Sequence, residues 1–318
     1  MRGKNILVIG SSNTDMIIKL DRIPRPGETL LGGRFMTAGG GKGANQAIGA
    51  AKAGGKVTFI ACIGRDMFGG TALAGFSQAG INVDYIVRDP SSPSGVAMIF
   101  VAGSGENSIA VAPGANANLS PSDVAKAKKA FAGAGMVVMQ LETPLRTVQS
   151  AAQLAAQLGV PVILNPAPAR PLSGKLLKNI AIITPNETEA ELLTGIKVNS
   201  KATASQAADA LRDRGVKTAI ITLGSRGVFF AGGEGRGSAP GFKVKAVDTT
   251  AAGDIFNGAL AVALAEEKTL ANAVLFANAA AAISVTRMGA QISAPTRREI
   301  EDFLAANEKS GVSREDGR

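Results

Sequence analysis

The sequence predicts an α/β fold of three layers: a mostly parallel, Rossmann-like central sheet covered by helices on both faces, with a small β-sheet projecting from it as a lid. Short apolar runs alternate with helix-like segments, which is typical of parallel strands buried on both faces. Polar residues follow these runs, and two β-rich stretches interrupt the alternation. At 318 residues the chain is at the upper end for one core, so we expect a single domain over 1–318.

Six apolar runs are the expected strands of the central sheet. They lie at 6–9, 57–63, 136–139, 162–164, 180–183 and 218–221. Helices are expected between these runs and throughout the C-terminal third. They span 44–53, 121–131, 144–158, 202–214, 254–266, 269–285 and 295–306. The polar residues 306–318 are expected to fray.

Two stretches, 16–37 and 95–112, break the alternation with β-rich patterns and with turns at Pro24 and Pro26. We expect them to form a small antiparallel sheet beside the main body. A separate sheet that returns the chain to the edge of the main one is suited to act as a lid, and its outer face is a candidate dimer contact.

The chain contains no histidine, which excludes Ser-His and Cys-His catalysis and removes the usual transition-metal ligands. Acid–base chemistry must then use carboxylates or lysines, and a bound metal would be a hard ion held by oxygen, such as Mg²⁺ or K⁺. The single cysteine, Cys62, fits a reducing compartment. With no signal-like or membrane-spanning segment in the sequence, we expect a cytoplasmic protein without membrane contact.

The net charge of +9 suits either a nucleic acid or a small anionic substrate as a partner. Lysine and arginine are scattered, tryptophan is absent and aromatic residues make up 4% of the chain. Because this leaves no stacking platform and no basic stripe, we expect no nucleic-acid partner.

The most informative segment is 248–258, with the sequence DTTAAGDIFNG. Its small residues at 251–253 let backbone N–H groups approach an anion, and the apolar helix that follows directs its positive dipole end to the same point. Asp254 would lie beside that anion and suits a base for an attacking hydroxyl. A helix N-cap role for Asp254 fits the segment equally well.

A glycine-rich turn at 39–46, GGGKGANQ, opens another helix. Lys42 is followed by Gly43, which does not match the Walker pattern, and Ala44 stands where the dinucleotide fingerprint has its third glycine. The backbone of this turn can lie close to a polyhydroxy ligand, with Lys42 and Asn45 as donors. A hinge for the lid fits the turn equally well.

Two further polar sites follow the first and third strand runs, at the edge where open α/β sheets bind ligands. Asn13 and Asp15 follow the first run at alternate positions, so their side chains share one face, and Glu142 follows the third run. All three suit sugar hydroxyls, although turn chemistry explains Asn13 and Asp15 as well, and simple solvation explains Glu142.

Polar residues also follow the fifth and sixth runs. Asn186 and Glu189 match a helix capping box, and a glutamate at this edge also suits the water shell of Mg²⁺. The stretch 222–227, TLGSRG, suits nucleotide phosphates or a tight turn.

Six of these segments, in order, resemble the motifs of the ribokinase family of carbohydrate kinases. They are NTD at 13–15, GGKGANQ at 40–46, NPAPA at 165–169, TPNETE at 184–189, TLGSRG at 222–227 and VDTTAAGD at 247–254. The resemblance runs over about 6–304, nearly the whole chain. It implies a ribokinase-like fold and an ATP-dependent sugar kinase that phosphorylates the 5-hydroxyl of D-ribose.

The resemblance also implies a role for each matching residue. Asp254 is the implied general base, and the N–H groups of Ala251, Ala252 and Gly253 are the implied anion hole. The implied ribose ligands are Asn13, Asp15, Gly41, Lys42, Gly43, Ala44, Asn45, Glu142 and Asp254. The implied ATP ligands are Asn186, Thr222, Leu223, Gly224, Ser225, Arg226, Gly227, Gly253 and Asn278.

Two metals and a partner chain follow from the same resemblance. Glu189 is implied to support Mg²⁺ through water. The implied K⁺ ligands, several through backbone carbonyls, are Asp248, Thr250, Ser284, Arg287, Gly289 and Ser293. A homodimer is implied in which lid strands of both subunits cover the sugar. The alternatives are a kinase of deoxyribose, fructose or a nucleoside, or a non-catalytic sugar-binding regulator.

Overall fold

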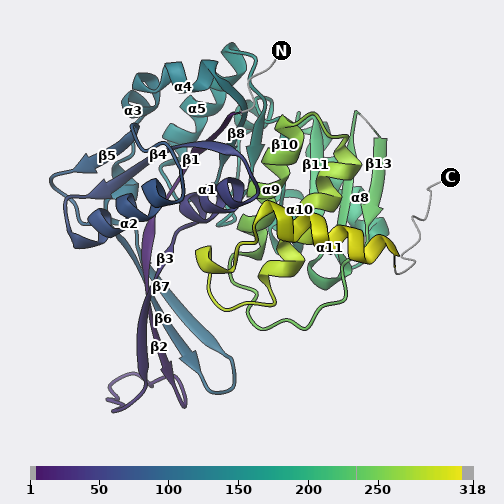
Figure 1. Cartoon of the computed structure of the whole chain (residues 1–318). Coiled ribbons are helices and arrows are strands. Elements are labelled where there is room, and N and C mark those ends of the chain that lie inside the picture. Colours follow the sequence, from purple (N-terminus) through teal and green to yellow (C-terminus); the bar gives the residue numbers. More distant parts are fainter. Residues whose placement is uncertain (1–4, 234, 310–318) are drawn as a thin grey trace.

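The computed structural model describes residues 5–233 and 235–309. Its main sheet has nine strands in the order β13-β12-β11-β10-β9-β8-β1-β4-β5 (Figure 1). They are β1 (Asn5–Ile9), β4 (Lys56–Gly64), β5 (Ile86–Asp89), β8 (Ala134–Met139), β9 (Val162–Leu164), β10 (Ile182–Ile183), β11 (Thr218–Thr222), β12 (Val228–Gly232) and β13 (Gly235–Ala239). The strands from β11 to β5 pair in parallel, and β12 and β13 add an antiparallel edge, so the predicted mostly parallel sheet is confirmed.

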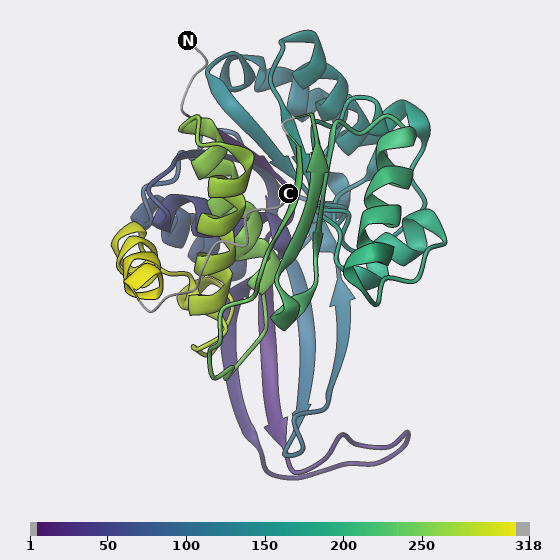
Figure 2. The same cartoon turned by 90° about the vertical axis from the view of Figure 1, so that its right-hand side faces the viewer.

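Helices cover both faces of this sheet, because its strands direct alternate apolar side chains into two separate cores. In β1, Ile6 and Val8 belong to one core, and Leu7 and Ile9 to the other. The first core is closed by α1 (Lys42–Lys52), α2 (Met67–Gln78), α9 (Ala252–Ala265), α10 (Leu270–Ser284) and α11 (Arg297–Lys309). The second is closed by α3 (Pro121–Lys126), α4 (Lys128–Ala132), α5 (Leu145–Gln157), α6 (Gly174–Leu177), α7 (Glu187–Thr194) and α8 (Lys201–Asp213). The predicted three layers are visible in Figure 2.

Three local predictions differ from the structure. The helix expected at 121–131 is two helices, because Ala127 leaves helical geometry with φ −85° and ψ 12°. The strand expected at 180–183 pairs only over Ile182–Ile183, since the N–H of Ile180 still bonds to the carbonyl of Leu177 in the preceding turn. Fraying from 306 is wrong for 306–309, which continue α11; the rest of the predicted tail lies outside the described residues.

The predicted second sheet projects from one end of the main body (Figures 1 and 2). Its strands, in the order β3-β2-β6-β7, are β2 (Asn13–Leu20), β3 (Arg34–Gly40), β6 (Gly95–Ala102) and β7 (Asn107–Ala112). The sheet is not purely antiparallel as expected, because β2 and β6 pair in parallel. The chain returns to the main body between them, so both strands leave it at the same hinge, where Asn13 pairs with Gly95.

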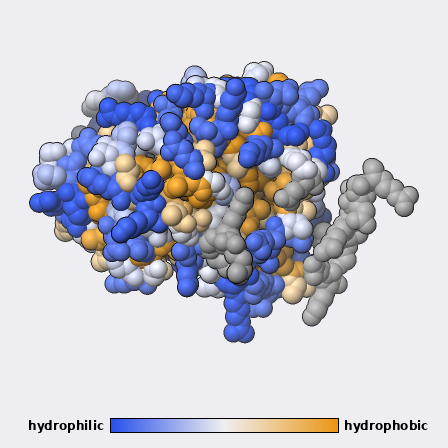
Figure 3. All heavy atoms as spheres, turned by 90° about the horizontal axis from the view of Figure 1, so that it is seen from above, coloured by the Kyte–Doolittle hydropathy of each residue, from blue (hydrophilic) through white to orange (hydrophobic). Residues whose placement is uncertain are grey.

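The lid leaves the main body at the carboxyl-terminal edge of the parallel strands, directly after β1. The opposite face of the molecule is hydrophilic around its rim, with apolar residues gathered in its middle (Figure 3). Within the described residues, no helix is both long and apolar enough to cross a membrane.

Candidate active site

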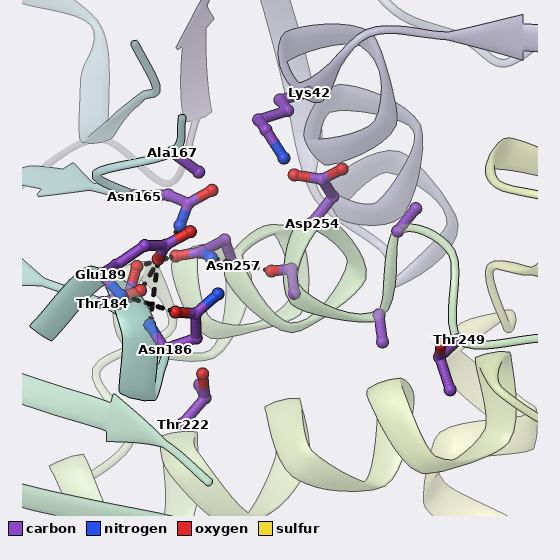
Figure 4. Close-up of a pocket in the computed structure, with 13 residues that line it drawn as sticks. Lys42, Asn165, Ala167, Thr184, Asn186, Glu189, Thr222, Thr249, Asp254 and Asn257 are labelled. Atoms are coloured by element: carbon purple, nitrogen blue, oxygen red, sulfur yellow. Dashed lines mark hydrogen bonds between the residues drawn. The ribbon is translucent and has the colours of Figure 1, made fainter. Parts of the chain in front are cut away.

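A cavity of about 170 Å³ lies at the carboxyl-terminal edge of the parallel strands. Residues that follow β9 and β10 line it, together with the end of β11, Lys42 of α1 and the start of α9 (Figure 4). The lining residues are Lys42, Asn165, Ala167, Thr184, Asn186, Glu189, Thr222, Thr249, Ala251, Ala252, Gly253, Asp254 and Asn257. The polar strand ends thus converge with the 249–254 turn on one hollow.

Asp254 lies in the first turn of α9 with 6% of its surface exposed. It does not cap the helix: the N-cap residue is Ala251, and α9 has no side-chain cap among the described residues. Instead, its Oδ2 accepts a hydrogen bond from the side-chain amide of Asn45 at 3.0 Å, and its Oδ1 accepts one from Gln46 at 2.9 Å. The N-cap alternative is therefore wrong, and the carboxylate points toward the ammonium of Lys42 (Figure 4).

Asp254 and Lys42 each favour the charged form of the other in this buried site. Burial raises the pKa of Asp254, although the Lys42 ammonium and the amides of Asn45 and Gln46 act against the rise. Burial disfavours the Lys42 ammonium too, but the carboxylates of Asp254 and Glu142 leave the pKa of Lys42 above its ordinary value. A cation therefore faces a carboxylate of increased basicity, which suits proton abstraction.

The turn before α9 has the geometry of an anion site. Ala251 has a φ of 60°, in the left-handed region that residues other than glycine rarely adopt, and α9 begins immediately after it at the cavity. The first N–H groups of a helix have no partner within the helix and carry its positive dipole end. A Cβ at Gly253 would meet nothing within 4 Å, so the space beside this residue is open, whereas the N–H of Ala252 bonds to the carbonyl of Thr249 at 3.3 Å.

Glu142 connects the end of β1 to the start of α1. Its Oε2 accepts hydrogen bonds from the Ser11 hydroxyl at 2.5 Å and from the backbone N–H of Lys42 at 2.9 Å. Near it, the side-chain oxygen of Asn45 is buried without a hydrogen-bond partner among the described residues. Because an unpaired buried acceptor is costly, this oxygen is suited to a ligand hydroxyl.

Asp15 lies at the base of the lid, on β2, close to the same charges. A Cβ at Gly40 of β3 would overlap the Asp15 carboxylate, so a glycine is needed there. Burial, together with the negative charges of Glu142 and Asp254, raises the pKa of Asp15 to about 6. Neighbouring Asn13 accepts a hydrogen bond on its Oδ1 from Asn116 at 2.8 Å.

Asn186 and Glu189 form the predicted capping box of α7. Asn186 Oδ1 accepts a hydrogen bond from the N–H of Glu189 at 2.8 Å, and Glu189 Oε2 accepts one from the N–H of Asn186 at 2.9 Å (Figure 4). Burial raises the pKa of Glu189 despite the N–H of Asn186. Both residues also line the cavity, so the structural role and a ligand role are compatible.

Of the other residues expected to bind the nucleotide on the strand side, Thr222 lines the cavity but 223–227 and Asn278 do not. The segment Gly224–Arg226 forms a 3₁₀ turn, η2, directly after β11. Gly227 has a φ of 94° and a Cβ there would overlap the backbone of 239–241. Asn278 donates its amide to the carbonyl of Pro240 at 2.9 Å, which places it beside that turn.

The six residues expected around a monovalent cation belong to two segments that are tied together. Asp248 Oδ1 accepts the N–H of Thr250 at 2.9 Å, and its Oδ2 accepts the N–H of Gly289 at 2.8 Å. Burial alone would raise the pKa of Asp248, but these hydrogen bonds outweigh it and lower the pKa. The Arg287 guanidinium pairs with Glu299 at 2.6 Å, so its side chain is engaged elsewhere. No cluster of three or more acidic or sulfur side chains of the metal-holding kind occurs in the described chain.

Several residues of the site were not assigned a role from the sequence. Thr184 donates to Asn257 Oδ1 at 2.7 Å, and the Asn257 amide donates to the carbonyl of Gly253, also at 2.7 Å, which braces the anion turn. Gln46 donates to Asn165 Oδ1 at 3.1 Å as well as to Asp254. Asn165 and Thr184 directly follow β9 and β10, and a polar residue at the end of a strand is the sequence signal for a residue of the site.

A family model described as pfkB family carbohydrate kinase matches residues 4–297. The chain belongs to this family of carbohydrate kinases. It is 50% identical over 301 residues to a ribokinase of Haemophilus influenzae, covering 95% of this chain and 98% of the relative. It is 38% identical over 309 residues to a deoxyribokinase of Salmonella typhimurium, covering 96% and 100%.

Among solved structures, the kinase is similar to an Arabidopsis thaliana ribokinase complexed with ribose and ATP. The TM-score is 0.88 at 34% identity, covering 96% of this chain and 99% of the other. The resemblance to carbohydrate kinases found in the six motifs is thus confirmed, as is the ribokinase-like fold.

Proposed function

We propose that this carbohydrate kinase transfers the γ-phosphate of ATP to the 5-hydroxyl of D-ribose, giving ribose 5-phosphate and ADP. The observation that carries the proposal is the placement of Asp254, a buried carboxylate of raised pKa in the first turn of α9 that faces Lys42. Phosphoryl transfer needs mainly positioning and electrostatic stabilisation, and this arrangement offers both. The ribokinase of Haemophilus influenzae and the ribose complex of the plant ribokinase support ribose as the acceptor.

Asp254 acts as the general base in this proposal. It accepts the proton of the ribose 5-hydroxyl as the oxygen attacks the γ-phosphorus, the bond to the ADP oxygen breaks, and ADP leaves. The N–H groups of Ala251, Ala252 and Gly253 stabilise the charge that develops on the transferred phosphoryl group. Lys42 adds a positive charge beside the carboxylate of Asp254.

The sugar is held between the lid and α1. Asp15 and Glu142 accept hydrogen bonds from ribose hydroxyls, and the unpartnered oxygen of Asn45 accepts another. The ribose ligands are completed by backbone and side-chain groups of Asn13, Gly41, Lys42, Gly43 and Ala44. Gly41 has a φ of 85°, and a Cβ there would lie 2.7 Å from the N of Asn13, so only a glycine lets this turn pack against the start of β2.

The nucleotide lies along the ends of β10 and β11. Asn186 and Thr222 line the cavity toward its phosphates, and Leu223, Gly224, Ser225, Arg226, Gly227 and Asn278 border the region beyond it. Mg²⁺ fits an oxygen-rich site of this kind, with Glu189 holding it through water. When bound, the metal neutralises the charge of the phosphates.

The 248–250 turn and the 284–293 loop would together hold a monovalent cation, K⁺. Its oxygen ligands would come from Asp248, Thr250, Ser284, Arg287, Gly289 and Ser293; Arg287 would use its backbone carbonyl, because its guanidinium pairs with Glu299. The hydrogen bonds of Asp248 already join the two segments. A cation bound between them would stiffen the anion turn, which begins one residue after Thr250.

The apolar surface of the lid supports a homodimer. We also propose that the protein is cytoplasmic. Its register places Ile17, Met36, Ile99 and Ile109 on one face, and Ile18, Phe35 and Phe100 on the other, so the sheet is apolar on both sides. Phe35 and Ile109 are 65% and 56% exposed. A second lid would bury these side chains and cover the sugar from both subunits. The buried free thiol of Cys62 fits the reducing cytoplasm.

The test is a coupled assay with Mg²⁺, K⁺ and ATP over a panel of sugars. We expect turnover to be fastest with D-ribose and to yield ribose 5-phosphate. The deoxyribokinase relative makes deoxyribose the second candidate, and a higher kcat/KM for deoxyribose would favour it. ATP-independent sugar binding without any turnover would instead indicate a regulator.

A further inference from the structure

The side chain of Gln46 touches Asp254 and has no part in the roles assigned so far. Gln46 lies on α1, is fully buried, and shares with Asn45 the contact to the carboxylate of Asp254. These two neighbouring amides differ in how many of their polar atoms are engaged.

Every polar group of the Gln46 side chain is paired within the protein. Its Nε2 donates to Asp254 Oδ1 at 2.9 Å and to Asn165 Oδ1 at 3.1 Å, which engages both amide hydrogens. Its Oε1 accepts a hydrogen bond from Gln140 Nε2 at 2.6 Å. Asn45, in contrast, retains an unpartnered oxygen.

Gln140, Asn165 and Asp254 together fix the orientation of the Gln46 amide. A flipped Gln46 would turn its oxygen toward the acceptor oxygens of Asp254 and Asn165 and its nitrogen toward the nitrogen of Gln140, losing all three hydrogen bonds. Gln140 itself is held where Gly10 leaves room, since a Cβ at Gly10 would overlap the Gln140 side chain. The contacts thus form a buried chain that runs from Gly10 through Gln140 and Gln46 to the carboxylate of Asp254.

We propose that Gln46 is a positioning residue for phosphoryl transfer: its clamped amide holds Asp254 Oδ1 throughout the reaction and leaves Oδ2, shared with Asn45, to receive the proton. Asn45 has the free oxygen needed to turn toward the sugar, whereas Gln46 has no free polar atom with which to do so. The inference rests on the proposed role of Asp254 as the base.

The same contact affects the charge of Asp254. A donor to an ionised carboxylate stabilises the charged form, and Gln46 is one of the groups that act against the rise of the Asp254 pKa caused by burial. The charged groups that face Asp254 from neighbouring elements are Lys42 on α1, Glu142 after β8, Asp15 on β2 and Glu189 on α7. Because none of these is changed when Gln46 is replaced, a shift of the acid limb can be assigned to the lost hydrogen bond.

The experiment is the pH dependence of kcat for Gln46→Met, which keeps an unbranched side chain without the amide. We expect kcat to fall roughly ten- to a hundredfold, the KM for ribose to change little, and the acid limb of the kcat profile to move to higher pH. Gln140→Met, which leaves the donors of Gln46 in place, should give a smaller change in the same direction. Gln153→Met, on the exposed face of α5, is the matched control and should behave as wild type.

Thermal melts accompany each variant, and if Gln46→Met does not fold, Gln140→Met carries the test alone. A folded Gln46→Met enzyme with normal kcat and an unmoved acid limb overturns the proposal. If only Gln140→Met folds, the proposal is overturned by a Gln140→Met enzyme whose kcat and acid limb are those of wild type. Failure of the proposed function looks different: wild type then makes no ribose 5-phosphate, or Asp254→Asn keeps its turnover.

Discussion

The roles of single residues in this site follow from what each polar atom touches. Asp254 directs both oxygens to amides of α1 and neither to the backbone of its own helix, which separates a base from a cap. Glu189 does the opposite, since its carboxylate closes a capping box while it lines the cavity. Two carboxylates of the same site thus have different roles because their hydrogen bonds differ.

Asp15 makes a pH dependence of sugar binding testable. Its pKa is raised to about 6, so the carboxylate that would accept ribose hydroxyls is ionised above that pH and protonated below it. We expect the KM for ribose to rise as the pH falls through about 6. In Asp15→Asn the KM should be high and independent of pH over the same range. A wild-type KM that stays flat there would contradict this assignment.

At the scale of elements, α1 and α9 pack so closely that the site depends on two glycines. A Cβ at Gly258 of α9 would lie 2.6 Å from both the N of Ala50 and the O of Gln46. On α1, a Cβ at Gly49 would lie 3.1 Å from the side chain of Ile255. This approach brings the amides of Asn45 and Gln46 within reach of Asp254.

Gly258→Ala should therefore loosen the pair of helices. The added methyl meets backbone atoms that cannot rotate away, and we expect a loss of about 1–3 kcal/mol in the free energy of unfolding. Gly75→Ala is the matched control, because nothing lies within 4 Å of a Cβ at that position of α2. It should stabilise the protein by about 0.5–1 kcal/mol, as alanine does in an open helix position. Equal unfolding free energies for the two variants, from urea melts, would refute the close packing.

The buried strands and amphipathic helices were predictable from the sequence because burial imposes a period on apolar residues. β1, β4 and α5 are examples, and their ends moved by only a residue or so. The edge where the polar residues gather was predictable too, since ligand sites of such sheets lie at the carboxyl ends of strands.

The remaining elements carry weak local signals. α2 contains Gly69, Gly70 and Gly75, which lower helix propensity, and β13 has the sequence GRGSA with almost no apolar residues. Both are formed because the rest of the fold packs against them. The contacts of Gln46 with Asp254 join residues 208 positions apart, which no local pattern contains.

At the scale of the whole molecule, the lid is a sheet without a core of its own. The sheet projects from the main body (Figures 1 and 2), and its strand register places apolar side chains on both faces. Exposed apolar surface of this kind favours a partner that covers it. The proposed dimer would therefore be linked to the sugar site, because one sheet carries both Asp15, on β2, and the exposed apolar residues, such as Phe35 on β3 and Ile109 on β7.

The double variant Phe35→Asp and Ile109→Asp, with one charge on each lid face, should convert the proposed dimer to a monomer. Light scattering coupled to size exclusion measures the mass directly. Leu192→Asp is the control, since Leu192 is 50% exposed on α7, outside the lid, and its replacement should leave the mass unchanged. A wild-type monomer, or a double variant with the wild-type mass, would contradict a dimer built through the lid.

The most direct test of the account is the turnover of Asp254→Asn with ribose and ATP, with ribose binding measured by calorimetry on the same preparation. We expect kcat to fall roughly 100- to 10,000-fold, as for loss of a general base, while ribose still binds. Because burial raises the pKa of Asp254, its ionisation costs stability at neutral pH, so the variant should melt at or above the wild-type temperature. A well-folded variant that phosphorylates ribose at a near-normal rate would contradict Asp254 as the base.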